Sequence, residues 1–186
     1  ERPQERTVGV LGLGKLGAAA AMRMKANGFN VLGWSRTEKQ DEAVETFAGE
    51  DGLAGFLAQS DIVVCLLPLT PATRGILSAS FFAKMKPRGP LGAPILINAG
   101  RGGLQVEADI LAALEEKRLG AVSLDVFQTE PLPPESPLWT HPRVTITPHA
   151  AATSMPHALV PPMVDQMDAH DRGEKLKNLV DREAGY

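Results

Sequence analysis

The sequence is poor in the features that mark disulfide-rich, membrane-spanning and nucleic-acid-binding proteins. Its single cysteine, Cys65, cannot form a disulfide within the chain and favours a reducing compartment. The apolar runs are only as long as strands, so none is expected to span a bilayer, and the charged start ERPQER lacks the apolar core of a signal peptide. A net charge of −3 provides no basic surface for nucleic acid or an anionic membrane. We therefore expect a cytoplasmic protein that holds any anionic ligand locally.

What the sequence does contain is a repeated alternation of strand and helix patterns. Its 186 residues are 44% apolar, which is enough for one well-buried domain. The expected strands are TVGVLGLG, NVLGW, DIVVCLL, PILIN, GAVSLDV and RVTIT, and the expected helices are KLGAAAAMRMKANG, GLAGFLAQ, ASFFAKM and EADILAALEEK. Strands that are apolar on both faces and alternate with helices predict a doubly wound parallel sheet of the Rossmann type, a three-layer α/β/α fold.

The C-terminal part is expected to extend this domain. The stretch PLPPESPLWTHPRV is too rich in proline for a central strand and predicts an ordered surface loop. A last helix is expected over about 162–171, because Pro161 and Pro162 fit only the first turn of a helix. We predict a dinucleotide-binding domain over 1–175 and a short polar tail over 176–186.

A glycine-rich loop lies at the first junction of strand and helix. Gly12, Gly14 and Gly17 have G-x-G-x-x-G spacing. Gly12 permits the tight turn, Gly14 lets the backbone approach a pyrophosphate, and Gly17 lets the helix pack closely on the sheet. The helix N-terminus, which begins with Lys15 and Leu16, presents N–H groups and a positive dipole end to the phosphates. The loop predicts dinucleotide binding; the alternative is a turn with only a packing role.

The second strand ends without the acidic residue that usually holds the ribose hydroxyls of NAD. Trp34, Ser35 and Arg36 stand there instead. Arg36 can donate two hydrogen bonds to a 2′-phosphate, to which Ser35 adds a hydroxyl and Lys39 a further charge. The sequence therefore favours NADP(H) over NAD(H), against the alternative of a solvated turn with an ordinary surface arginine.

Three polar residues follow predicted strands at their carboxyl ends, where open α/β sheets bind ligands. They are Arg101 in LINAGRGG, Glu130 in LDVFQTEPL and His149 in TITPHAAAT. A histidine beside a carboxylate stays available as an acid near neutral pH, and an arginine grips a substrate carboxylate. Any one of them alone would be an ordinary loop residue. Together, beside a nicotinamide that supplies hydride, they suit reduction of a 2-keto acid, and no metal site is predicted.

Five motifs, in order along nearly the whole chain, resemble the cofactor-binding domain of the D-isomer-specific 2-hydroxyacid dehydrogenases. They are GLGKLG, LLPLTPATRGIL, INAGRGGLQVEADILAAL, LDVFQTEPLPPESPLW and VTITPHAAAT. Within that family the chain is most similar to the glyoxylate/hydroxypyruvate reductase A group, including WSR after the second strand and the C-terminal VDREAGY. The resemblance implies that Arg101 binds the substrate carboxylate and polarises its carbonyl. It also implies that His149, paired with Glu130, protonates the carbonyl oxygen.

The resemblance also implies contacts with the cofactor. Asp125 in LDVF is expected to meet the nicotinamide carboxamide, with a strand-end capping role as the alternative. Pro68, Thr73 and the backbone around Ala99 are expected to line the cofactor cleft. For Thr73 the alternative is that TPAT simply caps a short helix.

The sequence also departs from the family pattern. Those enzymes have a second, substrate-binding domain, built from a segment before the dinucleotide unit and reached again by the chain's last segment, whereas about six residues precede the first strand here. We expect the isolated chain to bind NADPH with little or no turnover, because a 2-keto acid needs two enclosing walls. The family's dimer arm is also mostly missing, which puts homodimerisation in doubt. Gly100, where the family often has Ala, is expected to loosen its loop, and ALVPP to interrupt the last helix.

Two other functions stay open at this point. One is a nucleotide-sensing or partner-binding domain of the same fold without catalysis, which would have no need of the full set Arg101, Glu130 and His149. The other is a 3-hydroxyacid dehydrogenase, which shares the glycine loop. Such an enzyme is expected to use a lysine base on a helix, and the sequence offers no context for one.

Overall fold

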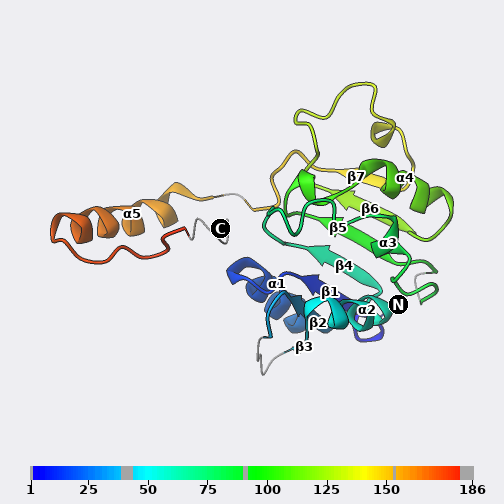
Figure 1. Ribbon diagram of the computed structural model, residues 1–186, viewed down its shortest axis with the longest axis horizontal. Coiled ribbons are helices and arrows are strands. Elements are labelled where there is room, and N and C mark those ends of the chain that lie inside the picture. The colour runs from blue at the N-terminus through cyan, green and yellow to red at the C-terminus, as the bar shows by residue number, and fades with distance from the viewer. Residues whose placement is uncertain (1, 39–43, 90–91, 153, 181–186) are drawn as a thin grey trace. The chain divides into compact units, whose positions relative to one another are not determined.

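The computed structural model describes residues 2–38, 44–89, 92–152 and 154–180 (Figure 1). Within them, a parallel sheet of seven strands has the order β3-β2-β1-β4-β5-β6-β7. The strands are β1 Thr7–Leu11, β2 Asn30–Ser35, β3 Glu45–Ala48, β4 Ile62–Cys65, β5 Ile95–Asn98, β6 Ala121–Leu124 and β7 Val144–Ile146. The strand order reverses between β1 and β4, which is the point where doubly wound sheets bind nucleotides.

Helices lie on both faces of this sheet. These are α1 Lys15–Ala26, α2 Gly49–Gln59, α3 Ala79–Phe82 and α4 Glu107–Glu115. The described residues also form the helix α5 Pro156–Asp171 and three short 3-10 helices, η1 Pro3–Glu5, η2 Gly102–Leu104 and η3 Pro137–Trp139. Successive residues of β1 point to opposite faces: Val10 packs in one apolar cluster with Ala21 of α1, and Leu11 in another that contains Phe56 of α2. Buried residues of α3 and α4 join the second cluster. The predicted α/β class and doubly wound sheet are confirmed.

The sequence does not predict the edge strand β3. Its four residues, Glu45–Ala48, are only half-buried or exposed, so the segment lacks the continuous apolar run that marks the central strands. In the structure, Phe47 pairs with Trp34 of β2, and its ring meets Phe56 edge-on, with 6.2 Å between ring centroids. β3 is therefore stabilised by contacts that only the assembled fold provides.

The predicted start of the last helix at residue 162, and its predicted interruption at ALVPP, are wrong. α5 runs continuously over Pro156–Asp171, with Pro156 in its first turn and Pro161 and Pro162 inside it. The two prolines leave the carbonyls of His157 and Ala158 without helical N–H partners. No residue of α5 is buried, so water can serve those carbonyls. The predicted end at Asp171 is confirmed.

The chain divides into two compact units, Glu1–His149 and Ala150–Tyr186. This division precedes the predicted boundary at residue 175, because α5 buries no side chain. The first unit holds the whole sheet and, as shown below, the candidate site. No described helix combines the length and the hydropathy that a membrane crossing requires.

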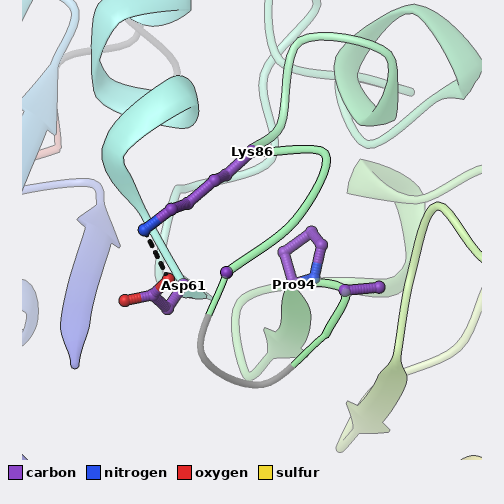
Figure 2. A pocket seen from close by; sticks show the side chains of 5 residues that line it. Asp61, Lys86 and Pro94 are labelled. Atoms are coloured by element: carbon purple, nitrogen blue, oxygen red, sulfur yellow. Dashed lines mark hydrogen bonds and ion pairs between the residues drawn. The ribbon is translucent and has the colours of Figure 1, made fainter. Parts of the chain in front are cut away.

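An ion pair between a buried carboxylate and a partly exposed lysine closes the amino-terminal edge of the sheet. Asp61, which is 3% exposed, accepts hydrogen bonds from the Thr7 amide at 2.9 Å and from Lys86 Nζ at 2.8 Å. Asp61 and Lys86 line a shallow hollow together with Gly89 and Pro94 (Figure 2). A Cβ at Gly89 would lie 2.5 Å from Asp61 Oδ1, so the close approach requires glycine. The carboxylate is satisfied within the protein, which indicates a structural role.

Candidate functional site

The glycine loop between β1 and α1 has the geometry that a dinucleotide needs. Gly12 has φ +112°, a conformation that a side chain would strain. An added Cβ at Gly17 would lie 1.8 Å from the Gly12 carbonyl oxygen, so the helix can approach the loop only with glycine there. Gly14 is the N-cap of α1, and a Cβ added to it would meet nothing within 4 Å. The loop thus leaves open space at the helix N-terminus, where a pyrophosphate would fit.

Lys15 and Leu16 begin α1 beside that space. Both are exposed, and 53% of the Leu16 surface is accessible although it is a large apolar side chain. The first turn of α1 contains no acidic residue that would repel a phosphate. Both residues are therefore placed as the sequence predicts, and their contact with a cofactor stays a prediction.

The end of β2 separates three side chains that the sequence places together. Trp34 is buried and donates its indole N–H to the Gly49 carbonyl at 2.9 Å, which ties β2 to the start of α2. Ser35 is also buried, and its hydroxyl donates to the Thr37 carbonyl at 2.7 Å. Arg36 is exposed, while the predicted contribution of Lys39 lies outside the described residues. Arg36 is thus the side chain at this strand end best placed to meet a 2′-phosphate.

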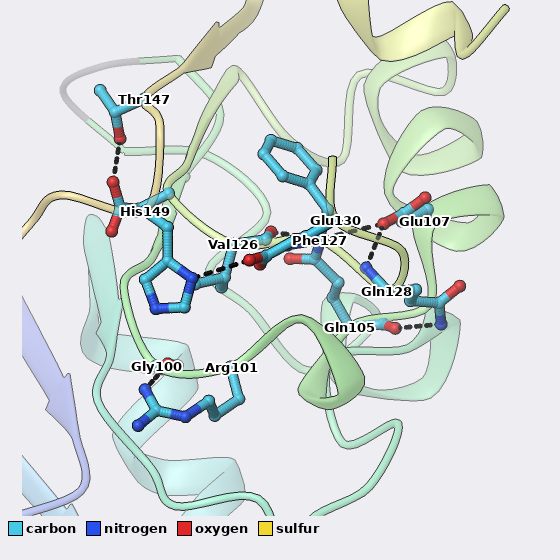
Figure 3. A network of polar contacts seen from close by, with 11 residues as sticks. Gly100, Arg101, Gln105, Glu107, Val126, Phe127, Gln128, Glu130, Thr147 and His149 are labelled. Carbon is cyan, nitrogen blue, oxygen red and sulfur yellow. Dashed lines mark hydrogen bonds and ion pairs between the residues drawn. The ribbon is translucent and has the colours of Figure 1, made fainter. Parts of the chain in front are cut away.

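The register of the sheet brings the three predicted catalytic residues to one edge. Asn98, the last residue of β5, pairs with Leu124 of β6, which is aligned in turn with Ile146 of β7. The loops that leave these strands therefore start side by side. Figure 3 shows Arg101 on the loop after β5 and His149 on the loop after β7.

Glu130 and His149 form the hydrogen-bonded pair that the resemblance implies. His149 Nδ1 lies 2.8 Å from Glu130 Oε2, and Glu130 Oε1 accepts the Phe127 amide at 3.0 Å. The hydrogen bond from His149, followed by that from Phe127, lowers the pKa of Glu130 below its ordinary value. The side chain of His149 is 49% exposed and that of Glu130 is 38% exposed, so a substrate can reach the pair. This geometry holds the imidazole of His149 in one orientation beside a carboxylate whose pKa is lowered.

The backbone at His149 is unusual for a residue with a side chain. Its φ is +53°, in the left-handed region that residues other than glycine rarely adopt. The His149 amide donates to the Thr147 carbonyl at 3.1 Å, so the chain turns sharply directly after β7. Strained conformations of this kind occur preferentially at functional sites, where the surrounding structure maintains them.

Asp125 directly follows β6, and its side chain reaches the residue that follows β7. It is 6% exposed, its amide donates to the Asn98 carbonyl at 3.0 Å, and its carboxylate accepts the Thr147 hydroxyl. The side chain therefore hydrogen-bonds to the residue directly after the neighbouring strand β7. Its predicted contact with a nicotinamide carboxamide stays a prediction.

Pro68, Thr73 and Ala99 lie at the carboxyl ends of β4 and β5. The Thr73 hydroxyl donates to the Pro68 carbonyl at 2.7 Å and accepts the Thr70 amide at 2.8 Å. Residues 71–75 form turns, so Thr73 closes a loop and does not cap a helix. Ala99 donates its amide to the Cys65 carbonyl at 3.2 Å. These contacts place the three residues next to the switch point of the sheet.

The prediction that Gly100 loosens its loop is wrong. Gly100 is buried, and its amide donates to Asn98 Oδ1 at 3.1 Å. An added Cβ would lie 2.9 Å from the Leu67 carbonyl oxygen and from Leu104 Cδ1. The glycine therefore allows a close approach, and the loop that carries Arg101 is held tightly.

Sequence reasoning missed two buried amides in this region. Asn98 and Gln105 are both 0% exposed, and Asn98 Nδ2 donates to Gln105 Oε1 at 2.7 Å. Asn98 Nδ2 also lies 3.3 Å from the Arg101 carbonyl, which fixes the start of that loop. The sequence does contain a signal for them: Asn98 ends the apolar run PILIN, and Gln105 lies inside GLQV. Polar residues in such apolar surroundings are expected to be buried with hydrogen-bond partners.

Other reactive groups are few in the described part of the chain. Burial raises the pKa of the Cys65 thiol to about 12, which makes it a small apolar side chain rather than a nucleophile. Among the described residues, no group of three or more His, Cys, Asp or Glu side chains could hold a metal ion.

Comparisons with known proteins agree with this geometry. Residues 1–151 match the family model of the D-isomer specific 2-hydroxyacid dehydrogenase, NAD binding domain. A glyoxylate/hydroxypyruvate reductase A from Serratia proteamaculans (strain 568) is 46% identical over 180 residues, covering 97% of this chain and 56% of that protein. The chain thus spans little more than half the length of this curated relative.

Solved structures give the same result. An NADPH-dependent glyoxylate/hydroxypyruvate reductase from Sinorhizobium meliloti, in complex with NADP and sulfate, has a TM-score of 0.96 and 50% identity, covering 100% of this chain and 58% of that one. A D-isomer specific 2-hydroxyacid dehydrogenase from Xanthobacter autotrophicus Py2, in complex with NADPH and MES, has a TM-score of 0.94 and 45% identity, covering 100% and 75%. The resemblance carried by the five motifs is confirmed. This chain belongs to the D-isomer specific 2-hydroxyacid dehydrogenase family, and it contains that family's NAD-binding domain.

Proposed function

We propose that the chain is the cofactor-binding domain of an NADPH-dependent reductase of 2-keto acids of the glyoxylate and hydroxypyruvate type. The observation that carries this proposal is the accessible Glu130–His149 pair, at 2.8 Å, on the sheet edge that also presents Arg101. The names of the Serratia and Sinorhizobium relatives, both glyoxylate/hydroxypyruvate reductases, support the substrate class.

Each of the three residues has a distinct task in this reaction. Arg101 grips the carboxylate of the 2-keto acid with its planar fork and polarises the neighbouring carbonyl. Glu130 remains ionised because its pKa is lowered, so it accepts a hydrogen bond at His149 Nδ1 and stabilises the charged imidazole. His149 then gives the proton of its other ring nitrogen to the carbonyl oxygen. The bound nicotinamide supplies the hydride.

The cofactor is NADP(H) in preference to NAD(H). Gly12, Gly14 and Gly17 form the pyrophosphate loop, and Arg36 at the end of β2 pairs with the 2′-phosphate. The NADP and NADPH in the two solved relatives support this preference. It is tested by fluorescence titration, in which NADPH binds at far lower concentration than NADH and Arg36→Ala largely erases the difference.

A matched control for that titration is Arg88→Ala, which removes another exposed arginine beside the hollow at the amino-terminal edge of the sheet. This variant is expected to keep the preference for NADPH. Equal affinity of the unmodified chain for NADH and NADPH would refute the role of Arg36.

The substrate pocket is completed by protein outside this chain. The chain spans 56% of the Serratia relative, and it provides one wall of a site that must exclude water. The isolated chain therefore binds NADPH with little or no turnover, and efficient reduction of glyoxylate or hydroxypyruvate by it would refute this. In the same proposal the complete protein is a cytoplasmic homodimer. Light scattering tests the dimer, and cell fractionation tests the location.

A catalytic role is separated from a purely nucleotide-sensing role by turnover in the complete protein. His149→Ala is expected to abolish reduction of a 2-keto acid while NADPH still binds. The pH profile of the unmodified protein should show an essential acid that this variant lacks. Unchanged turnover after His149→Ala would eliminate the proposed mechanism and favour the non-catalytic alternative.

A further inference from the structure

Gln105 is a fully buried polar side chain whose amide is hydrogen-bonded at both ends. It is 0% exposed. Its Oε1 accepts Asn98 Nδ2 at 2.7 Å, and its Nε2 donates to the Val126 carbonyl at 3.0 Å and lies 3.4 Å from Glu107 Oε1. Such a side chain is retained inside a protein only with its partners, because an unpaired amide is unfavourable there.

Two of these partners lie where loops of the candidate site begin: Asn98 ends β5, before the Arg101 loop, and Val126 follows β6, before Glu130. Figure 3 shows Gln105 and Val126 together with Phe127 and Glu130. Asn98 holds the loop of Arg101, since its Nδ2 lies 3.3 Å from the Arg101 carbonyl and its Oδ1 accepts the Gly100 amide. Val126 is followed by Phe127, whose amide donates to Glu130 at 3.0 Å. The Gln105 side chain therefore connects the backbone that carries the arginine to the backbone that orients the glutamate.

Three further contacts hold the loop of Glu130 against the segment from Gly102 to Glu107. Gln128 donates its Nε2 to the Gln105 carbonyl at 2.7 Å and its backbone amide to Glu107 Oε1 at 2.9 Å. A Cβ added to Gly102, directly after the arginine, would lie 1.7 Å from the Phe127 carbonyl oxygen. The two loops thus pack backbone against backbone, and Gln105 is the buried side chain that hydrogen-bonds across them.

We propose that Gln105 is a positioning residue that keeps the Arg101 loop at a fixed distance from the Glu130–His149 pair. This inference rests on the proposed function, because a 2-keto acid must be gripped by Arg101 and protonated by His149 at the same time. A small change in that distance weakens turnover much more than it weakens cofactor binding. The cofactor loop around Gly12 belongs to a different part of the sheet.

The position requires both a donor and an acceptor. Methionine has nearly the shape of glutamine but would leave the Asn98 amide and the Val126 carbonyl without this partner. Asparagine keeps the amide but is one methylene shorter, so it cannot reach both loops. Gln105→Met and Gln105→Asn are therefore both expected to uncouple the loops, and the second is available if the first fails to fold.

The first measurement uses this chain and does not depend on turnover. The carboxyl group of Glu130 is followed by NMR during a pH titration and is assigned by its disappearance in Glu130→Gln. Its pKa is lowered by His149 and by the Phe127 amide, with Asp125 acting in the opposite direction. In Gln105→Met the pKa should rise toward its ordinary value of 4.5, and the Gly100 and Phe127 amides should exchange faster with solvent.

The second measurement is turnover in the complete protein. Gln105→Met should lower kcat/KM for the 2-keto acid between about tenfold and a hundredfold and leave NADPH affinity within about twofold. The matched control is Gln59→Met on the exposed face of α2, where the side chain bonds only to Gly55 of its own helix. That control should change neither measurement.

Two results would overturn the proposal. One is an unchanged Glu130 titration and unchanged amide exchange in both Gln105 variants. The other is a loss of NADPH affinity as large as the loss of kcat/KM, which would indicate general disruption of the fold. If the unmodified protein shows no reductase activity, the proposed function fails, while the NMR titration still decides whether Gln105 couples the two loops.

Discussion

Replacing Gly17 by alanine tests the tightest contact of the cofactor loop. Alanine is the better helix former, and inside a helix it gains about 1 kcal/mol over glycine. At this position the added Cβ would lie 1.8 Å from the Gly12 carbonyl oxygen, whereas real Cβ contacts essentially never fall below 3.0 Å. The helix and the loop must therefore separate by at least 1.2 Å, the difference between these two distances.

The neighbour is a backbone carbonyl, which cannot escape by changing rotamer. We therefore place the overpacking penalty at the upper end of its usual range, about 3 kcal/mol. After the helix gain, Gly17→Ala should lower the free energy of unfolding by about 2 kcal/mol. For a protein of this size that is a fall in Tm of roughly 4–8 °C. NADPH affinity should fall by tenfold or more, because a loss of about 1.4 kcal/mol of binding free energy already produces that factor.

The matched control is Gly52→Ala in α2. The nearest atom to a Cβ added there is the Phe47 carbonyl carbon at 3.4 Å, an ordinary contact, so the helix gain should remain and the variant should be more stable by about 0.5–1 kcal/mol. Urea unfolding and fluorescence titration with NADPH measure both variants. If Gly17→Ala is as stable as the unmodified chain and binds NADPH equally well, the role assigned to this contact is wrong.

Three further predictions concern the ion pairs and the Arg101 loop. The lowered pKa of Glu130 means that its pairing with His149 contributes stability above the ordinary value of 4.5 and loses it as pH falls through the folded value. Glu130→Gln should thus lower the urea midpoint slightly at neutral pH and leave it unchanged in strong acid; a difference that grows in acid would contradict this. Asp61→Ala strands the Thr7 amide and the Lys86 charge, so calorimetry should show a loss of about 2–4 kcal/mol, and a loss below about 0.5 kcal/mol would refute its structural role. Gly100→Ala should cost about 1–2 kcal/mol in urea unfolding, since its Cβ would meet the Leu67 carbonyl at 2.9 Å; a stabilised variant would refute it.

The parts of the fold that could be predicted are those written in local patterns. The buried strands β1, β4 and β5 are continuous apolar runs, and the spacing of Gly12, Gly14 and Gly17 is itself a requirement of backbone geometry. β3 was out of reach because its stability comes from pairing with β2, which a four-residue segment does not encode by itself. The start of α5 differs from the prediction because α5 is exposed, so that water can serve the carbonyls that Pro161 and Pro162 leave without helical partners.

The candidate site divides in the same way. Arg101, Glu130 and His149 could be found because parallel strands present their carboxyl ends at one edge, and the structure places all three there. Gln105 could not be assigned, since Asn98, 7 residues away, and Val126, 21 residues away, become its partners only in the folded loops. Sequence patterns therefore identify the residues at the carboxyl ends of the strands better than the buried residues that hold the loops between them.

The buried thiol at the end of β4 allows the opening of the sheet to be measured by chemical labelling. Cys65 is the only cysteine, and with its pKa raised to about 12 the thiolate fraction in the folded chain at neutral pH is on the order of one in 10⁵. An alkylating reagent can therefore label the chain only in the moments when β4 is exposed. The labelling rate measures how often that happens, at the centre of the sheet and without any engineered probe. A ligand bound across the switch point would lower the labelling rate of Cys65. The thiol can therefore report cofactor binding even where no turnover is possible.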